Sequence, residues 1–283
     1  MFITTDAPQD PMILQFVPVL TQASEILREE YQRYCSGAAF DIETKSDNSP
    51  VTQADYRVNH YLTQALAELS KLPLLSEEGQ ENQRQTWQKF WLLDPLDGTK
   101  EFLHKRPEFT INLSLIDGSE TIFAILAIPA QHLLYICPLV GLPLKYNTLE
   151  DQWFEYKESD QEHAVQVGLS QSSQKKPKYA AYLESLAQLS EYTEFKAGSA
   201  YKFCMMLEDL VDIYPRFHPT CEWDTSAGQC MLERVGGGLI DLKGQPFIYN
   251  QRDTLLNGSF IAYTKPQFRT LALAALAGMV LER

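Results

Sequence analysis

Phe-Trp-Leu-Leu-Asp-Pro-Leu-Asp-Gly-Thr-Lys-Glu-Phe, at residues 90–102, is the stretch that decides the fold. Its four apolar residues predict a short buried strand that runs into Asp94. Pro95 is expected to end the strand, because proline has no N–H to donate. The Asp-Gly-Thr run at 97–99 adds a second carboxylate, a tight bend and a helix start. Carboxylates bind hard cations and helix N–H groups face anions, so this corner suits a divalent cation beside a phosphate.

The composition is that of a globular protein with an acidic balance. The chain has 283 residues, 45% hydrophobic and 22% charged, enough for one large domain or two closely joined lobes. The net charge of −13 argues against nucleic acid as a partner, because a phosphate backbone would be repelled. Five cysteines without a C-x-x-C pair predict reduced thiols and a cytoplasmic location.

Neither end of the chain indicates a membrane segment. The first residues lack the pattern of a signal peptide. The apolar segment 271–281 is too short to span a bilayer and predicts a buried C-terminal helix. We therefore expect no integral membrane segment.

Two helices are expected near the start of the chain. Residues 1–10 are polar and predict a frayed end, and apolar residues recur at helical spacing from 12 to 34. Alternation followed by a polar turn at 40–52 predicts a hairpin or an extended loop. Asp55 then begins a second helix. Plain helix capping explains an acidic residue at this position, and a functional role is the alternative.

A second strand that runs into carboxylates, Pro-Leu-Leu-Ser-Glu-Glu-Gly at 73–79, repeats the central pattern. If the two strands are neighbours, Glu77 or Glu78 meets Asp94 at one edge of the sheet. Alternating segments from 110 to 156 predict an antiparallel meander.

The charged run 157–163 lacks apolar spacing and marks the expected boundary between two lobes. Residues 1–157 are expected to form an α+β lobe with the antiparallel sheet and the metal-binding signature. Residues 158–283 show a βαβα rhythm and are expected to form an α/β lobe that carries a further acidic residue of interest. That residue, Asp224, precedes a helix, and plain capping is again an alternative.

Carboxylates lie at several expected strand ends or helix starts: Asp55, Glu77, Asp94, Asp97 and Asp224. No histidine pairs with a cysteine or another histidine at zinc-like spacing, so the all-oxygen set favours Mg²⁺. Several carboxylates in one cleft indicate two or more ions, and paired ions activate a water for in-line displacement at phosphorus. Thr99 would lie beside that water and relay a hydrogen bond to Asp55.

Four segments resemble the signatures of the inositol monophosphatase superfamily. Asp-Pro-Leu-Asp-Gly-Thr at 94–99 is similar to D-P-[IL]-D-G-T, and Trp-Asp-Thr-Ser-Ala-Gly at 223–228 is similar to W-D-x-[SA]-[AS]-G. Segments 49–55 and 76–78 also match, and all four occur in the family's order. The resemblance covers residues 13–263. It implies a layered αβαβα sandwich, α+β or α/β in class, with the site between the lobes.

Three further segments resemble the CysQ-type 3'(2'),5'-bisphosphate nucleotidases: Lys-Glu-Phe at 100–102, Lys-Phe-Cys at 202–204 and Asp-Ile-Tyr-Pro-Arg-Phe at 212–217. This resemblance implies a Mg²⁺-dependent, lithium-sensitive phosphomonoesterase of sulfur metabolism. Its substrate would be a small phosphorylated nucleotide, adenosine 3',5'-bisphosphate, which it converts to AMP, and the activity would extend to the sulfated form, PAPS. The alternative of peripheral attachment to the cytoplasmic face of the inner membrane stays open, as does the choice between monomer and homodimer.

Carried over residue by residue, the resemblance implies two sets of site residues. The metal set is Glu77, Asp94, Asp97, Asp224 and the carbonyl of Leu96. The substrate set is Glu77, Leu96, Asp97, Gly98, Thr99, Ser199, Lys202, Arg216 and Asp224. Glu77 rather than Glu78 is the expected ligand, because it is the first acid of the pair.

The resemblance also divides the chemistry among these residues. Asp55 and Thr99 would position the attacking water. The N–H groups of Gly98 and Thr99 would hold the scissile phosphate. The nucleotide pocket would lie in the 158–283 lobe, where the planar fork of Arg216 suits the second phosphate.

One loop departs from the CysQ-type pattern, which has Ser-Arg-Ser-His where this chain has Ser-Gln-Ser-Ser at 170–173. The missing arginine and histidine bear on substrate preference and not on hydrolysis. Lys175 and Lys176 offer replacement charges, although a lysine pair in a polar loop is also typical of a solvated surface. Two alternative functions stay open: an inositol monophosphatase, and a non-catalytic nucleotide-binding protein on the same fold.

Overall fold

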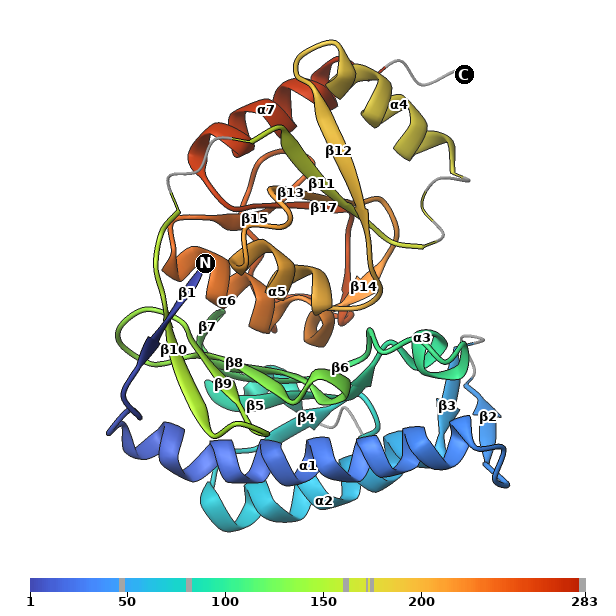
Figure 1. Cartoon of the computed structure of the whole chain (residues 1–283), viewed down its shortest axis with the longest axis vertical. Helices are drawn as coiled ribbons and strands as arrows, with labels where there is room; N and C mark the ends of the chain where they lie inside the picture. Colours follow the sequence, from blue (N-terminus) through green and yellow to red (C-terminus); the bar gives the residue numbers. More distant parts are fainter. Residues whose placement is uncertain (46–48, 80–82, 160–162, 172, 174–175, 280–283) are drawn as a thin grey trace.

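The computed structural model describes residues 1–45, 49–79, 83–159, 163–171, 173 and 176–279. These residues stack in five layers, which Figure 1 shows from bottom to top as helices, sheet, helices, sheet and helices. The αβαβα sandwich expected from the sequence is confirmed.

The larger sheet is built around β5 (Lys89–Asp97), the strand of the central stretch. The strand order is β1-β10-β9-β8-β7-β6-β5-β4. The other strands are β1 (Phe2–Thr5), β4 (Leu74–Ser76), β6 (Thr110–Asp117), β7 (Glu120–Ile128), β8 (Leu133–Cys137), β9 (Leu144–Asn147) and β10 (Gln152–Tyr156). β4 runs parallel to β5, whereas the other pairs are antiparallel. The segment that follows β4 therefore arrives at the same sheet edge as the end of β5.

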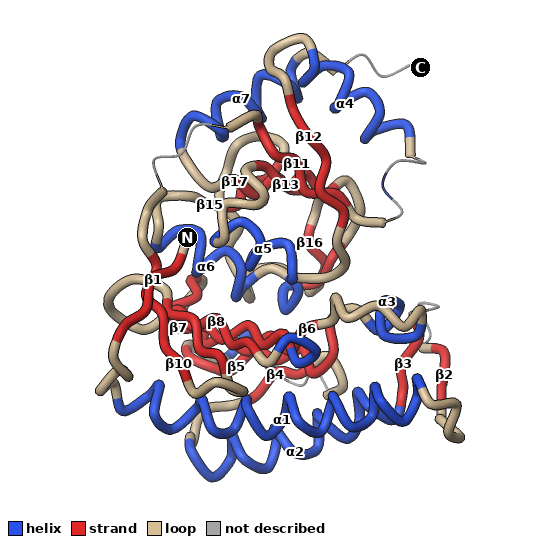
Figure 2. Tube along the Cα trace, in the orientation of Figure 1, coloured by secondary structure: helices blue, strands red, loops and turns tan. Residues whose placement is uncertain are grey.

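Two helices cover the outer face of this sheet, and a short hairpin joins them (Figure 2). They are α1 (Pro11–Cys35) and α2 (Gln53–Leu69), with hairpin strands β2 (Ile42–Thr44) and β3 (Pro50–Thr52). The Asp10 carboxylate caps α1 by accepting hydrogen bonds from the N–H groups of Met12 and Ile13. Thr52 caps α2, and Asp55 closes a capping box by accepting from the Thr52 N–H.

The smaller sheet has the order β12-β11-β13-β17-β15. Its strands are β11 (Val165–Leu169), β12 (Tyr192–Lys196), β13 (Ile213–Arg216), β15 (Gly238–Asp241) and β17 (Phe260–Tyr263). Parallel pairing of β11 with β12 and β13 follows the predicted βαβα rhythm, and β17 adds antiparallel pairs. The outer helices are α4 (Pro177–Ala187) and α7 (Pro266–Ala277), and the short strands β14 (Thr220–Cys221) and β16 (Leu256–Asn257) pair separately.

The middle layer consists of α5 (Tyr201–Leu207) and α6 (Ser226–Arg234), which lie between the two sheets. One apolar cluster joins Phe90 and Leu126 of the larger sheet with Phe203 and Met231 of these helices. Segments from both sides of residue 157 therefore share one core. None of the helices in the described ranges has the length and hydrophobicity to cross a membrane.

The prediction of a frayed N-terminus is wrong for the first residues. β1 pairs with β10 and aligns Phe2 with Tyr156. The Phe2 ring also packs edge-on against Tyr135 and Tyr156. The partner of this strand lies about 150 residues away, so no local pattern could indicate it.

The prediction that Pro95 ends its strand is also wrong. β5 continues to Asp97, and its register against β6 shifts between Asp94 and Asp97. A bulge of this kind accommodates proline, because the residue in it has no ladder partner for an N–H. The bulge brings Asp94 and Asp97 to the same end of the strand.

The contact between α5 and α6 gives a stability prediction. A Cβ added at Gly228 would lie 2.2 Å from the Phe203 ring, whereas one at Gly258 meets nothing within 4 Å. We expect Gly228→Ala to lower the free energy of unfolding by about 1–3 kcal/mol, because the helices must move apart. Gly258→Ala is the matched control and should change it by less than about 0.5 kcal/mol. Equal urea midpoints for the two variants would contradict this packing.

Candidate active site

A cleft of about 590 Å³ lies at the end of β5. Its walls come from α3 (Thr99–Leu103), the loop 197–200, the end of β13 and the 3-10 turn η4 (Glu222–Asp224). The cleft therefore takes residues from both the larger and the smaller sheet regions.

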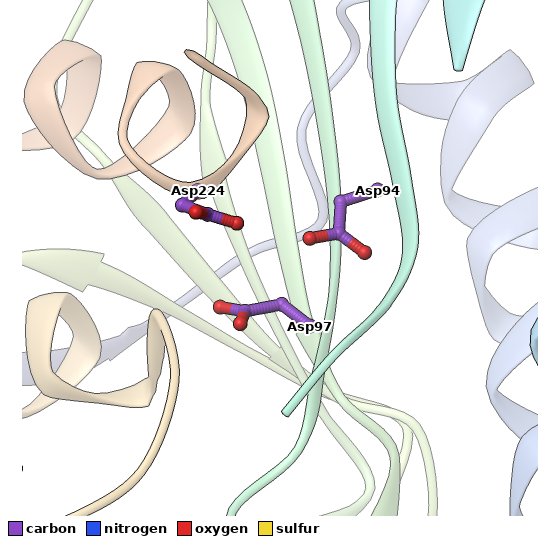
Figure 3. Close-up of side chains that lie close together, drawn as sticks. All are labelled: Asp94, Asp97 and Asp224. Atoms are coloured by element: carbon purple, nitrogen blue, oxygen red, sulfur yellow. The ribbon is translucent and has the colours of Figure 1, made fainter. Parts of the chain in front are cut away.

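Three carboxylates converge in this cleft: Asp94, Asp97 and Asp224. One oxygen from each lies within 4.8 Å of the others, and Figure 3 shows the side chains pointing toward one another. Asp94 and Asp97 come from the two sides of the β5 bulge, and Asp224 comes from η4, just before α6. This placement agrees with the carboxylate cluster expected from the sequence.

Backbone N–H groups orient each member of this cluster. Leu96 N–H donates to Asp94 Oδ1 at 3.0 Å, and Ala200 N–H donates to Asp97 Oδ2 at 2.6 Å. Cys221 N–H donates to Asp224 Oδ2 at 2.7 Å. Each carboxylate keeps further acceptor sites, and an oriented all-oxygen donor set fits a hard divalent cation.

Burial is the largest cause that raises the pKa of all three carboxyls, and nearby negative charges add to it. Burial raises the pKa of Asp97 to about 6, and burial together with the Asp97 charge raises that of Asp224 to about 8. Burial and the charge of Glu77 raise the pKa of Asp94 well above its ordinary value. The cluster therefore resists full ionisation when no cation is bound.

Glu77 lies beside this cluster, because β4 and β5 are parallel neighbours. Its N–H donates to the Leu93 carbonyl at 3.0 Å, and its side chain lines the cleft. Lys45 Nζ, from the segment after β2, contacts Glu77 Oε1 at 2.8 Å and Glu78 Oε1 at 2.5 Å. The cleft lining includes Glu77 and not Glu78.

Asp55 and Thr99 meet at the start of α3. Asp55 is 2% exposed, and its Oδ2 accepts hydrogen bonds from the Thr52 N–H and hydroxyl. Its other oxygen faces the Thr99 hydroxyl at 3.3 Å, and the same hydroxyl lies 3.3 Å from the Leu96 carbonyl. The capping and functional interpretations of Asp55 are therefore compatible, because each uses a different oxygen.

Three of the predicted substrate residues, Gly98, Ser199 and Arg216, line the cleft. Gly98 has a φ of +95°, and a Cβ there would lie 3.1 Å from the Ser199 Cβ, so the two loops approach closely. Ser199 has a φ of +43°, and its hydroxyl donates to the Glu108 carbonyl at 2.7 Å. Arg216 lines the cleft and donates from Nη1 to the Ser170 hydroxyl at 2.7 Å.

Lys202 is buried and is not among the residues that line the cleft. It is 0% exposed, and its Nζ donates to the Ala197 and Ser199 carbonyls, both at 2.9 Å. These two hydrogen bonds hold the loop whose Ala200 N–H donates to Asp97.

The loop at 170–173, which differs from the CysQ-type pattern, is partly described. Its Ser170 N–H donates to the Ser173 hydroxyl at 3.1 Å. Ser172 and Lys175 lie outside the described residues.

Sequence reasoning assigned no site role to several polar residues that line the cleft. Lys100 and Arg106 line it from α3 and the following loop, and His218 lines it just after β13. Glu108 Oε2 accepts from the Gly198 N–H at 2.7 Å and so fixes the loop before Ser199. The only available signal was a concentration of basic residues between 100 and 106, which alone is typical of a solvated surface.

The layered fold and the acidic cleft define a class, the phosphatases built on the αβαβα sandwich. The family model described as "Inositol monophosphatase family" matches residues 9–277, and the chain belongs to this family. It is therefore a phosphatase.

Named relatives cover most of the chain. The chain is 34% identical over 232 residues to "3'(2'),5'-bisphosphate nucleotidase CysQ" of Escherichia coli strain K12. The match covers 81% of this chain and 91% of that protein. The protein of the same name from Aggregatibacter actinomycetemcomitans is 29% identical, over 92% of this chain and 93% of that protein. The crystal structure of CysQ from Bacteroides thetaiotaomicron is 27% identical with a TM-score of 0.75, and the match covers 90% of this chain and 97% of that one.

The raised pKa of Asp224 gives a prediction for the metal-free protein. Its folded-state pKa of about 8 exceeds the ordinary value of 3.8, so the folded state binds a proton that the unfolded state releases. The free energy of unfolding of the metal-free protein should therefore fall as pH rises from about 4 to about 8. Mg²⁺ should raise it again by binding the ionised cluster. We expect Asp224→Asn to flatten this pH dependence and to lose most of the Mg²⁺-induced rise in melting temperature.

The control for this measurement is Glu184→Gln on the exposed face of α4. It should reproduce the parent curves with and without Mg²⁺. A Mg²⁺-induced rise that Asp224→Asn leaves undiminished would remove Asp224 from the cation site.

Proposed function

We propose that the protein is a Mg²⁺-dependent phosphomonoesterase that converts adenosine 3',5'-bisphosphate to AMP and phosphate, and PAPS to adenosine 5'-phosphosulfate. One observation carries the proposal: carboxylates and cationic side chains line the same cleft. Asp94, Asp97 and Asp224 form the carboxylate cluster, and Arg216 and Lys176 are among the cationic side chains. A substrate with two separated anionic groups suits such a cleft, and the CysQ relatives carry the matching name.

Mg²⁺ fits the donors of the carboxylate cluster. The residues that would hold two or more ions are Glu77, Asp94, Asp97, Asp224 and the carbonyl of Leu96. When bound, such ions supply an activated water and stabilise the charge on the leaving oxygen. We place the site between the proposed lobes 1–157 and 158–283, in a protein of cytoplasmic location.

Asp55 and Thr99 would position the attacking water. The Thr99 hydroxyl donates to Asp55 Oδ1, which leaves its lone pairs to accept a hydrogen bond from a water. Because Thr52 holds the other Asp55 oxygen, the carboxylate cannot turn away from Thr99. The pair thus fixes the direction from which the water approaches phosphorus.

The reaction is a hydrolysis at phosphorus. The water oxygen forms a bond to the 3'-phosphorus, the ester bond to the ribose oxygen breaks, and that oxygen leaves with a proton. Gly98 and Thr99 would hold the phosphate with their N–H groups, since the left-handed Gly98 turns the chain into α3 at this point. Arg216 would hold the remaining phosphate.

A substrate panel tests this proposal. With Mg²⁺ we expect kcat/KM for adenosine 3',5'-bisphosphate to exceed that for inositol 1-phosphate by at least about tenfold, because a charge-assisted contact to a second phosphate contributes about 1.5–3 kcal/mol. EDTA should abolish turnover and lithium should inhibit it, as measured by phosphate release. Faster hydrolysis of inositol 1-phosphate would favour the monophosphatase alternative. Nucleotide binding without turnover would favour the non-catalytic one.

Replacement of Thr99 tests the water-positioning pair. We expect Thr99→Val to lower kcat by about 10²-fold or more, because the relay to Asp55 is lost in a side chain of equal size. Thr99→Ser keeps the hydroxyl and should retain most of the activity. Thr270→Val on the exposed face of α7 is the matched control. A Thr99→Val enzyme with parental kcat would exclude Thr99 from the chemistry.

A further inference from the structure

A further group of side chains lines the same cleft as the three carboxylates. Arg216 ends β13, His218 lies two residues further on, and Lys176 immediately precedes α4; all three line the cleft. Burial and the positive charges of Arg216 and Lys100 lower the pKa of Lys176, so these three cationic groups act on one another electrostatically. Asp97 and Asp224 offset part of the Arg216 charge, and an anion that contacts both Arg216 and Lys176 would reduce the repulsion between them.

His218 holds Lys176 in this group. Lys176 Nζ forms a hydrogen bond with His218 Nε2. An ammonium group only donates, so Nε2 accepts, and the ring is neutral with its proton on Nδ1. Burial and the charges of Lys176 and Arg216 lower the pKa of His218, in agreement with a neutral ring. The ring in turn packs edge-on against the buried Tyr179, with centroids 5.3 Å apart.

Arg216 retains donors for a ligand. Its Nη1 donates to the Ser170 hydroxyl at 2.7 Å, which fixes the plane of the guanidinium. Its Nε is buried and has no hydrogen-bond partner among the described residues. A buried donor without a partner is costly, and an anion accepting from it would remove that cost.

We propose that Lys176, held in place by His218, binds the second anionic group of the substrate together with Arg216, and that this contact sets the preference for bisphosphates over monophosphates. The inference rests on the proposed function and assigns its substrate selection to particular residues. His218 is a positioning residue: it reduces the conformational freedom that an exposed lysine would otherwise lose when the substrate binds. Lys176 contributes the charge and Arg216 the planar fork.

Paired substrates test this selection directly. Adenosine 3',5'-bisphosphate and adenosine 3'-monophosphate present the same scissile phosphate and differ in the second one. We expect Lys176→Met to lower kcat/KM for the bisphosphate by about tenfold or more and to change it for the monophosphate less than about twofold. Lys178→Met, on the same exposed first turn of α4, removes a charge that also acts on His218 but does not line the cleft. It is the matched control and should change kcat/KM for either substrate by less than about twofold.

His218 is tested by coupling to Lys176. We expect His218→Ala to raise KM for the bisphosphate at unchanged kcat, and to add no further loss in the Lys176→Met background, because its effect passes through Lys176. His218→Gln keeps a side-chain acceptor and should recover part of the affinity. A purely structural role would instead change both substrates equally and add to the effect of Lys176→Met.

The outcomes separate this inference from the proposed function. If the parent enzyme prefers the bisphosphate and Lys176→Met keeps the full preference, the inference is overturned and the proposed function stands. If the parent enzyme shows no preference for the bisphosphate, both are overturned.

Discussion

The burial of carboxylates that lie close together is the constraint on which the site depends. Asp94, Asp97 and Asp224 come together in one cleft, and burial raises the pKa of each, so the arrangement opposes their ionisation. The fold tolerates it because backbone N–H groups from three separate segments each hold one carboxylate. A cation would satisfy the oxygens that remain. The fold thus positions an all-oxygen donor set that fits a divalent cation.

Cationic side chains line the same cleft as the carboxylates. Lys176 and Arg216 both belong to its lining, and Lys176 forms a hydrogen bond with His218. Under the proposed function, the carboxylates would hold cations and the cationic side chains would hold an anionic group of the substrate. A bisphosphate would then engage both sets of groups, whereas a monophosphate would engage only one.

The sequence predicts the parts of this protein that are local. The central stretch, the two long helices, the antiparallel meander and the carboxylates at strand ends all follow from periodicity and turn chemistry. The bulge at Pro95 does not, because its partner strand decides whether the ladder continues. The pairing of Phe2 with Tyr156 and the burial of Lys202 depend on contacts across the whole chain. Lys176 and His218 look like surface residues until the fold brings them together.

The close contact of Gly228 with Phe203 has a geometric consequence for the site. It locks α6, whose start follows Asp224, against α5, whose preceding loop holds Asp97. The helix contact therefore links the segment that carries Asp224 to the loop whose N–H group orients Asp97, a residue of β5. A substitution that moves the two helices apart would disturb the relative placement of these two carboxylates, even though it changes no charge in the cleft.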